Sequence, residues 1–271
     1  MSEIGLRLTL QQIVLPLRKI RLLGLAMLAN FIIAPALALG IARLLQLEEP
    51  FAIGLLLLGL SAGAPFMPKI VEIAKGDVAL AVGLLVIFMA STIIFLPIVL
   101  PQLVSGTQVN PAKIVILLIV MILLPLIAGL LIKARAALFA ARAAPILERV
   151  SGIALLATII AIFSLHSQSL LAMFGTPAAW AGLLFSVLTA LAGWLLGGRD
   201  AAQRMALGLG TGFRSFPAAL IVSVQNFPDP NVTVMVIVTT FIALIVLVPV
   251  SLLMGRRRPA IPPRTGDRRS K

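Results

Sequence analysis

Apolar runs of about 20 residues recur along this chain from near residue 22 to residue 254, and each is long enough to cross a hydrocarbon core about 30 Å thick. Hydrophobic residues make up 61% of the 271 residues and charged residues only 11%, which excludes a soluble globular domain. The runs lack the alternating pattern of membrane β-strands, and only helices otherwise satisfy their own backbone in lipid. The sequence therefore predicts an all-α polytopic membrane protein.

Hydropathy predicts eight full spans when glycine, proline and charged residues are taken as their boundaries. They lie near residues 22–46, 51–75, 78–104, 112–133, 150–172, 177–197, 202–225 and 231–254. The segment 4–16 that precedes them is apolar but short and contains Arg7, so we expect either an interfacial segment or the end of a span.

The basic residues divide unevenly between the loops, although the net charge is +13 overall. One set of alternate loops contains Arg18, Lys19, Arg21, Lys75, Lys133, Arg135, Arg142, Arg149, Arg199, Arg204 and the tail from Arg256 to Lys271. The other set contains only Arg43 and Lys113. The positive-inside rule then places the C-terminus and the 134–149 loop in the cytoplasm. We expect no nucleic-acid partner, because these charges do not gather on one folded face.

Two of the predicted spans contain clustered glycine and proline near their midpoints. Span 51–75 contains GLSAGAPFMPK, and span 202–225 contains GLGTGFRSFP. Because these residues unwind helices and free backbone groups at membrane depth, both spans are predicted to be discontinuous helices around a buried or wet site. The breaks lie about 150 residues apart, as do the ends of the spans that follow them, which indicates an inverted repeat of the kind found in secondary transporters.

Each broken span carries one basic residue at mid-membrane depth, Lys69 in the first and Arg214 in the second. A charge within a membrane span costs several kcal/mol and persists mainly where it has a function or a partner. Both residues are therefore candidates for binding an anion. The alternatives are that Lys69 pairs with Glu72 at i,i+3, and that Arg214 donates to unwound carbonyls of the other break. Glu72 either faces the crossing, as a coupling residue, or only neutralises Lys69.

Hydroxyl side chains near the breaks are candidates for hydrogen bonds to a substrate. They are Thr211 and Ser215 in the second break and Ser91 and Thr92 in the span that follows the first. The alternative is that each hydroxyl bonds backbone nearby. Asp77 follows a glycine at the end of the first broken span, where it is expected to cap the next helix.

An enzyme is not expected. Gly59 to Gly63 matches the G-x-S-x-G pattern of serine hydrolases, but the nucleophile Ser61 would lie in a membrane helix rather than in a strand-to-helix turn. His166 is the only histidine and there is no cysteine, so neither a histidine-rich nor a cysteine metal site is available. The sequence predicts no catalytic residue, no metal and no cofactor.

The broken spans resemble those of the bile acid:sodium symporter family. In that family the first crossover reads small-Pro-Gly-Gly-x-x-Ser-Asn and precedes A-x-G-D-x-A-L-x-V, where this chain has AGAPFMPK and AKGDVALAV. The second crossover, Glu-Thr-Gly-x-Gln-Asn, is similar to Gly210–Ser215, and a V-S-T motif is similar to Ala90–Thr92. The resemblance implies a ten-helix inverted repeat with a core and a panel domain, which carries organic anions with sodium.

Within that frame the chain begins inside the second helix of the family, so we expect an N-terminally short member. The family's sodium-site Ser-Asn is replaced by Pro68-Lys69, and its Glu and Gln-Asn by Gly210 and Arg214-Ser215. We hypothesise that the two cationic side chains stand in for bound sodium, since sodium requires oxygen ligands with net negative character.

The resulting prediction is a secondary transporter of a small organic anion that works by alternating access without sodium coupling, as a uniporter, an exchanger or a proton-coupled carrier. The alternative is a non-transporting or channel-like relative that acts as a sensor or assembly partner. We expect an integral protein of a bacterial inner membrane. Its predicted parts are a partial helix and loop (1–21), core half 1 (22–104), panel helices (105–172), core half 2 (173–255) and a basic cytoplasmic tail (256–271).

Overall fold

The computed structural model describes residues 19–104, 110–136, 138–140, 142–147, 149–150, 153 and 175–256. Its helices are α3 (Ile20–Leu28), η2 (Ala29–Ile33), α4 (Ala34–Leu44), α5 (Glu49–Leu60), α6 (Met67–Ile73), α7 (Val78–Leu103), α8 (Pro111–Leu118), η3 (Ile119–Leu123), α9 (Leu124–Arg135), α11 (Pro177–Leu196), α12 (Ala201–Gly212), α13 (Phe216–Asn226) and α14 (Pro230–Arg256). The two η segments are single π turns inside otherwise continuous helices.

Seven of the eight predicted spans correspond to helices whose ends lie within two residues of the prediction. The eighth, 150–172, falls outside the described residues except for its first positions, as does His166. Six helices in the described ranges are long and apolar enough to cross a membrane. The Asp77 carboxylate accepts a hydrogen bond from the Leu80 amide at 3.0 Å, so the predicted cap of α7 is confirmed.

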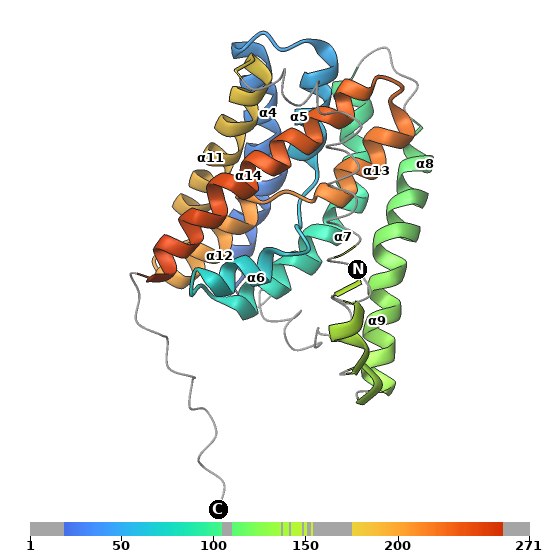
Figure 1. Ribbon diagram of the computed structural model, residues 1–271, viewed down its shortest axis with the longest axis vertical. Coiled ribbons are helices and arrows are strands. Elements are labelled where there is room, and N and C mark those ends of the chain that lie inside the picture. The colour runs from blue at the N-terminus through green and yellow to red at the C-terminus, as the bar shows by residue number, and fades with distance from the viewer. Residues whose placement is uncertain are drawn as a thin grey trace, which may run out of the picture.

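The two predicted breaks are present, between α5 and α6 and between α12 and α13. Figure 1 shows the two unwound segments passing each other in the interior of the molecule. Helices α4, α11 and α14 pack around α5 and α12, while α7 packs against α5 and α6. The continuous helix formed by α8, η3 and α9 stands at the edge of the molecule, where α8 contacts α7 and α13.

The core surrounds this crossing and consists mainly of aliphatic side chains. Its largest fully buried members include Leu57, Leu84, Phe88, Phe185 and Phe213. Lipid tails are as apolar as these side chains, so the helices associate through close packing rather than by exclusion of water.

Small residues let α11 and α12 approach closely. A Cβ added at Gly193 would lie 2.5 Å from the Leu207 carbonyl oxygen and 2.6 Å from Thr211 Oγ1. Backbone cannot move aside as a flexible side chain can. Gly193 therefore sets the separation of the two helices and, through Thr211, the position of the second break.

Gly193→Ala is expected to destabilise the protein by about 1–3 kcal/mol, the usual cost of overpacking. Gly40→Ala in α4 is the matched control, because nothing lies within 4 Å of a Cβ added there. The control is expected to be neutral or to gain up to about 1 kcal/mol in helix propensity. Thermal unfolding in detergent measures both variants, and equal midpoints would contradict the close approach.

Candidate functional site

The two broken helices are joined to each other at their unwound segments. In the first break, Gly63 adopts a φ of +87°, which glycine accommodates without strain, and Pro68 lies in the first turn of α6. In the second, Pro217 lies in the first turn of α13. The Ser215 amide donates to the Ser61 carbonyl at 2.9 Å. This hydrogen bond satisfies backbone groups that lipid would leave unpaired.

Arg214 lies at this junction with its side chain only 5% exposed. Its Nε donates to the Leu58 carbonyl at 2.9 Å, and its Nη2 donates to the Gly59 carbonyl at 2.6 Å. Nη1 donates to Asn30 Oδ1 at 2.7 Å and, more weakly, to the Thr211 carbonyl at 3.5 Å. Nη2 also donates to the Asn30 carbonyl at 3.2 Å. These five acceptors match the five N–H groups of a guanidinium.

None of these acceptors is a carboxylate, so the positive charge is balanced by dipoles. Leu58 and Gly59 lie in the last turn of α5, and Thr211 lies in the last turn of α12. The C-terminus of a helix carries the equivalent of about half a negative charge. Two helix ends directed at one guanidinium therefore offset about one positive charge. These contacts agree with the alternative stated from the sequence, in which Arg214 donates to carbonyls of the other broken helix.

Asn30 completes this arrangement and was not singled out from the sequence. It lies in the π turn η2, where the Ala34 amide donates to Ala29 rather than to Asn30. The next residue, Pro35, has no N–H to donate, so the Asn30 carbonyl is free to accept from Arg214. The Asn30 side-chain amide also donates to the Ala26 carbonyl at 3.0 Å and to Thr211 Oγ1 at 3.1 Å. An asparagine five residues before a proline in an apolar span is the signal that could have identified it.

Three of the four candidate hydroxyls make contacts with backbone or side-chain atoms. Thr92 Oγ1 accepts from the Ala62 amide at 3.0 Å and donates to the Ala62 carbonyl at 3.1 Å, so it stabilises the first break. Thr211 and Ser215 are buried at the junction. Ser91 is half-buried, with Oγ 4.0 Å from the sulfur of Met27. Thr92, Thr211 and Ser215 therefore lie at the crossing. Ser91 is their neighbour in the chain through Thr92, and the role of all four in substrate binding stays a prediction.

Lys69 does not join the Arg214 network. Its Nζ lies 2.8 Å from Glu72 Oε2, and the two side chains are 70% and 59% exposed. This is the i,i+3 pair that the sequence offered as the alternative to anion binding. One ammonium proton is engaged by Glu72, and an ammonium has two more. The two basic residues therefore occupy different environments, one enclosed and one open.

A cavity of about 10 Å³ lies beside Arg214, close to the minimum that admits one water molecule. Phe66, Phe213, Ser186 and Thr239 are among its lining residues. Thr239 Oγ1 is buried without a hydrogen-bond partner among the described residues. Ser186 and Thr239 were not predicted, because single hydroxyl residues in apolar spans carry no distinguishing pattern. Within the part of the chain that the structure describes, this cavity is too small for an organic anion, so binding beside Arg214 would require the helices to move.

Comparison with known proteins gives one family and two relatives. A family model described as "Sodium Bile acid symporter family" matches residues 1–173. An "Uncharacterized sodium-dependent transporter YocS" from Bacillus subtilis (strain 168) is 31% identical over 152 residues, which are 54% of this chain and 46% of the relative. A "Probable sodium/metabolite cotransporter BASS2, chloroplastic" from Oryza sativa subsp. japonica is 32% identical over 133 residues, which are 48% and 32% of the two chains.

The chain thus spans less than half the length of each of these relatives in the aligned part. The family match ends before α11 begins. The second broken helix, with Arg214, lies beyond the matched residues.

Proposed function

The chain belongs to the Sodium Bile acid symporter family, and from this premise we propose that it is a secondary transporter of a small organic anion, in which the Arg214 guanidinium takes the place of a coupling sodium ion. The relatives carry names of transporters and cotransporters rather than of enzymes. Both names include sodium, which makes the identity of the cation at the crossing the central question.

The observation that carries the proposal is the set of five oxygen acceptors around Arg214. In transporters with broken helices, unwound carbonyls and the C-terminal ends of half-helices are the groups that coordinate a sodium ion or a proton. Here such groups surround a guanidinium, which remains charged and is covalently attached. A sodium ion at the same oxygen atoms would meet a like charge.

Substrate binding is assigned to the two faces of this crossing. Lys69 is exposed, and the two ammonium protons that Glu72 does not engage can bind a carboxylate of the substrate directly. Thr211, Ser215 and Thr92 reach substrate once the crossing opens, and Ser91 flanks them. In this scheme the two core halves, 22–104 and 173–255, move against the panel, 105–172. Lys113 Nζ on α8 donates to the Gln225 carbonyl on α13 at 3.0 Å, one contact that this movement would break.

Uptake by proteoliposomes tests the proposal. The purified full chain is reconstituted, and accumulation of a panel of radiolabelled small carboxylates is measured with an inward sodium gradient or an equal choline gradient. Uptake at equal rates in the two gradients is expected. Transport that strictly requires sodium would overturn the assignment of Arg214, and absence of transport by correctly folded protein would favour the non-transporting alternative.

Lys69→Met is expected to raise the apparent KM for the anion by up to about fivefold, because an exposed ion pair contributes up to about 1 kcal/mol. Lys69→Met with Glu72→Met is the matched control for charge balance. If Lys69 binds substrate, the double variant keeps the high KM. If Lys69 only neutralises Glu72, the double variant recovers the KM of the wild type.

A further inference from the structure

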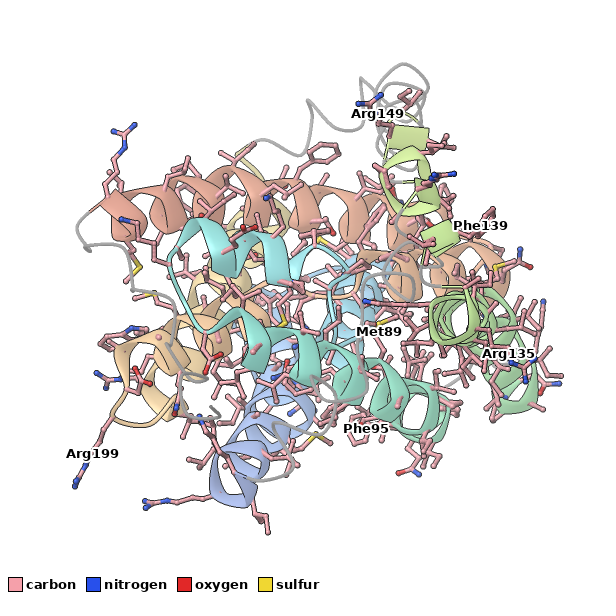
Figure 2. The ribbon with its side chains drawn as sticks, turned by 90° about the horizontal axis from the view of Figure 1, so that it is seen from below. Met89, Phe95, Arg135, Phe139, Arg149 and Arg199 are labelled. Carbon is pink, nitrogen blue, oxygen red and sulfur yellow. The ribbon has the colours of Figure 1, made fainter. Side chains whose placement is uncertain are left out.

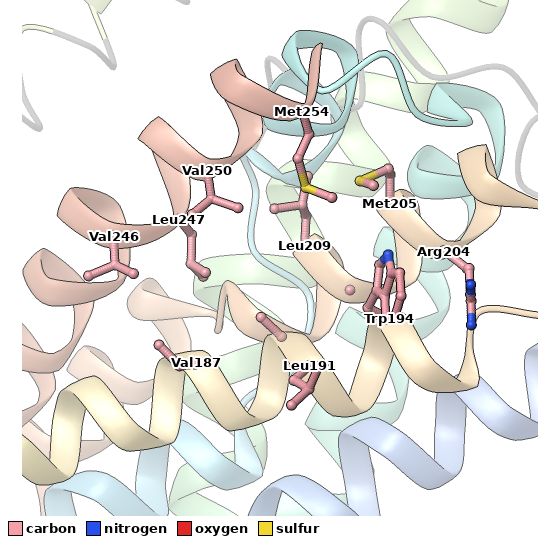
Figure 3. Close-up of a pocket in the computed structure, with 12 residues that line it drawn as sticks. Val187, Leu191, Trp194, Arg204, Met205, Leu209, Val246, Leu247, Val250 and Met254 are labelled. Atoms are coloured by element: carbon pink, nitrogen blue, oxygen red, sulfur yellow. The ribbon is translucent and has the colours of Figure 1, made fainter. Parts of the chain in front are cut away.

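An apolar groove lies on the outer side of α12, between α11 and α14, and it plays no part in the function proposed above. Its volume is about 360 Å³, roughly ten times the share of liquid volume of one water molecule. Val187, Leu191 and Trp194 form the α11 wall, and Val246, Val250 and Met254 form the α14 wall, with Gly208 and Leu209 of α12 between them. Figure 3 shows the side chains of the two walls and of Leu209 along the groove. We call this surface the outer groove.

The outer groove is open on its hydrocarbon side. Leu191, Val187 and Val250 remain substantially exposed on helices that are long and apolar enough to span the membrane. Gly208 lies at the bottom of the groove and has no side chain to fill it; a Cβ there would approach Trp194 Cβ to 2.9 Å. A hollow that faces the bilayer core is filled by a lipid chain or by a side chain of another protein.

One end of the outer groove is basic. The guanidinium of Arg204 lies 4.1 Å from the centre of the Trp194 ring, and Figure 3 shows the two groups side by side at that end. The Arg204 Nε is buried with no hydrogen-bond partner among the described residues. Asp200, the nearest acid in the sequence, is engaged in capping α12 through the Ala202 amide at 2.9 Å. The positive charge of Arg204 therefore lacks an acidic partner within the described ranges.

Two further arginines lie at the same end of these helices. Arg199 is exposed immediately before α12, and Arg256 is exposed in the last turn of α14. Figure 1 shows the start of α12 and the end of α14 at the same side of the molecule. Tryptophan and arginine at the end of a membrane span are typical of the level of the lipid headgroups. An apolar channel that ends in clustered positive charge matches a molecule with a hydrocarbon chain and an anionic head.

We propose that the outer groove binds one acyl chain of an anionic phospholipid, whose phosphate is held by Arg204. The chain fills the space between α11 and α14, and the headgroup lies at the level of Arg199, Arg204 and Arg256. Basic residues at a membrane surface each strengthen the binding of anionic lipid by about fivefold. A zwitterionic phospholipid can fill the same groove and place its phosphate at Arg204, but its quaternary ammonium group is repelled by the three arginines.

The test compares phosphatidylglycerol with phosphatidylcholine of identical acyl chains, titrated into the delipidated full chain in detergent. Thermal unfolding and native mass spectrometry report stabilisation and retained lipid. Phosphatidylglycerol is expected to bind at least about fivefold more tightly, and Arg204→Gln should lower that preference by about fivefold. Arg135→Gln is the control, since Arg135 is exposed and lies at the opposite edge of the molecule from Arg199 in Figure 2; it should keep the preference.

Val250→Trp, which fills the outer groove while leaving Arg204 in place, should weaken binding of both lipids. Soluble glycerol phosphate, which has the head but no chain, should fail to stabilise the protein. Equal binding of the two lipids, an undiminished preference in Arg204→Gln, or stabilisation by glycerol phosphate alone would each overturn the proposal. Because the readout is the difference between lipids, a lower baseline stability of a variant does not obscure it.

Discussion

Arg214→Ala is expected to lower the free energy of unfolding by about 3–5 kcal/mol, because several buried oxygen acceptors lose their donor, at about 1–3 kcal/mol each. The substitution leaves the Leu58 and Gly59 carbonyls and Asn30 without their donor in an enclosed site. If the guanidinium takes the place of sodium, these oxygen atoms become available to a free cation. Sodium should then partly restore the stability of the variant, by about 1.4 kcal/mol at ten times its dissociation constant.

Thermal unfolding in detergent with sodium chloride or choline chloride measures this effect. Wild-type protein should unfold at the same temperature in both salts, whereas Arg214→Ala should unfold higher in sodium. Arg43→Ala, at an exposed position in the last turn of α4, is the control and should show neither effect. A wild type that sodium stabilises, or a variant indifferent to sodium, would argue against substitution of the ion by the side chain.

Asn30→Leu should cost about 2–4 kcal/mol, because it leaves one Arg214 N–H unpaired in a buried site and removes the donor to Thr211. The size of the side chain hardly changes, so packing contributes little to the loss. The midpoint of thermal unfolding measures this effect. Where unfolding is reversible, denaturant titration gives the free energy of unfolding directly. Asn226→Leu is the matched control, since Asn226 makes a single bond within its own helix, to the Val222 carbonyl, and should cost under about 1 kcal/mol.

The double variant Asn30→Leu with Arg214→Ala separates a network from two independent sites. Residues in one hydrogen-bond network couple by about 0.5–3 kcal/mol. The double variant should therefore be less destabilised than the two single variants predict together. Simple additivity would show that Asn30 supports its own helix without positioning Arg214.

The helices and both breaks could be predicted from the sequence because hydropathy and the glycine and proline clusters are local signals. The network around Arg214 could not, because it depends on residues far apart in the chain. The guanidinium reaches Leu58 and Gly59 only because α5 and α12 end at the same place. Asn30 contributes only because a π turn and Pro35 together free its carbonyl. Those conditions are set by the packing of three helices, and no single segment shows them.

The surroundings of Lys69 and Arg214 also differ in a way that the sequence could not predict. Lys69 and Arg214 lie in corresponding broken spans and were given the same interpretation from the sequence. Lys69 lies within the regular turn of α6, so its neighbour at i+3, Glu72, is within reach. Arg214 lies in the unwound segment, so its nearest acceptors come from other helices. The same charge in the two broken spans thus has a local partner in one and a long-range network in the other.

The covalent attachment of the guanidinium also has an electrical consequence. A sodium ion that crosses with its substrate is released, and the empty carrier returns without that charge. Arg214 must travel back on the protein, so its charge cancels over a complete cycle. Each turnover with a monovalent anion would then move one net negative charge, which an inside-negative potential opposes on entry by about 2.3 kcal/mol per 100 mV. The membrane voltage would favour efflux of the anion, or its exchange for another of equal charge.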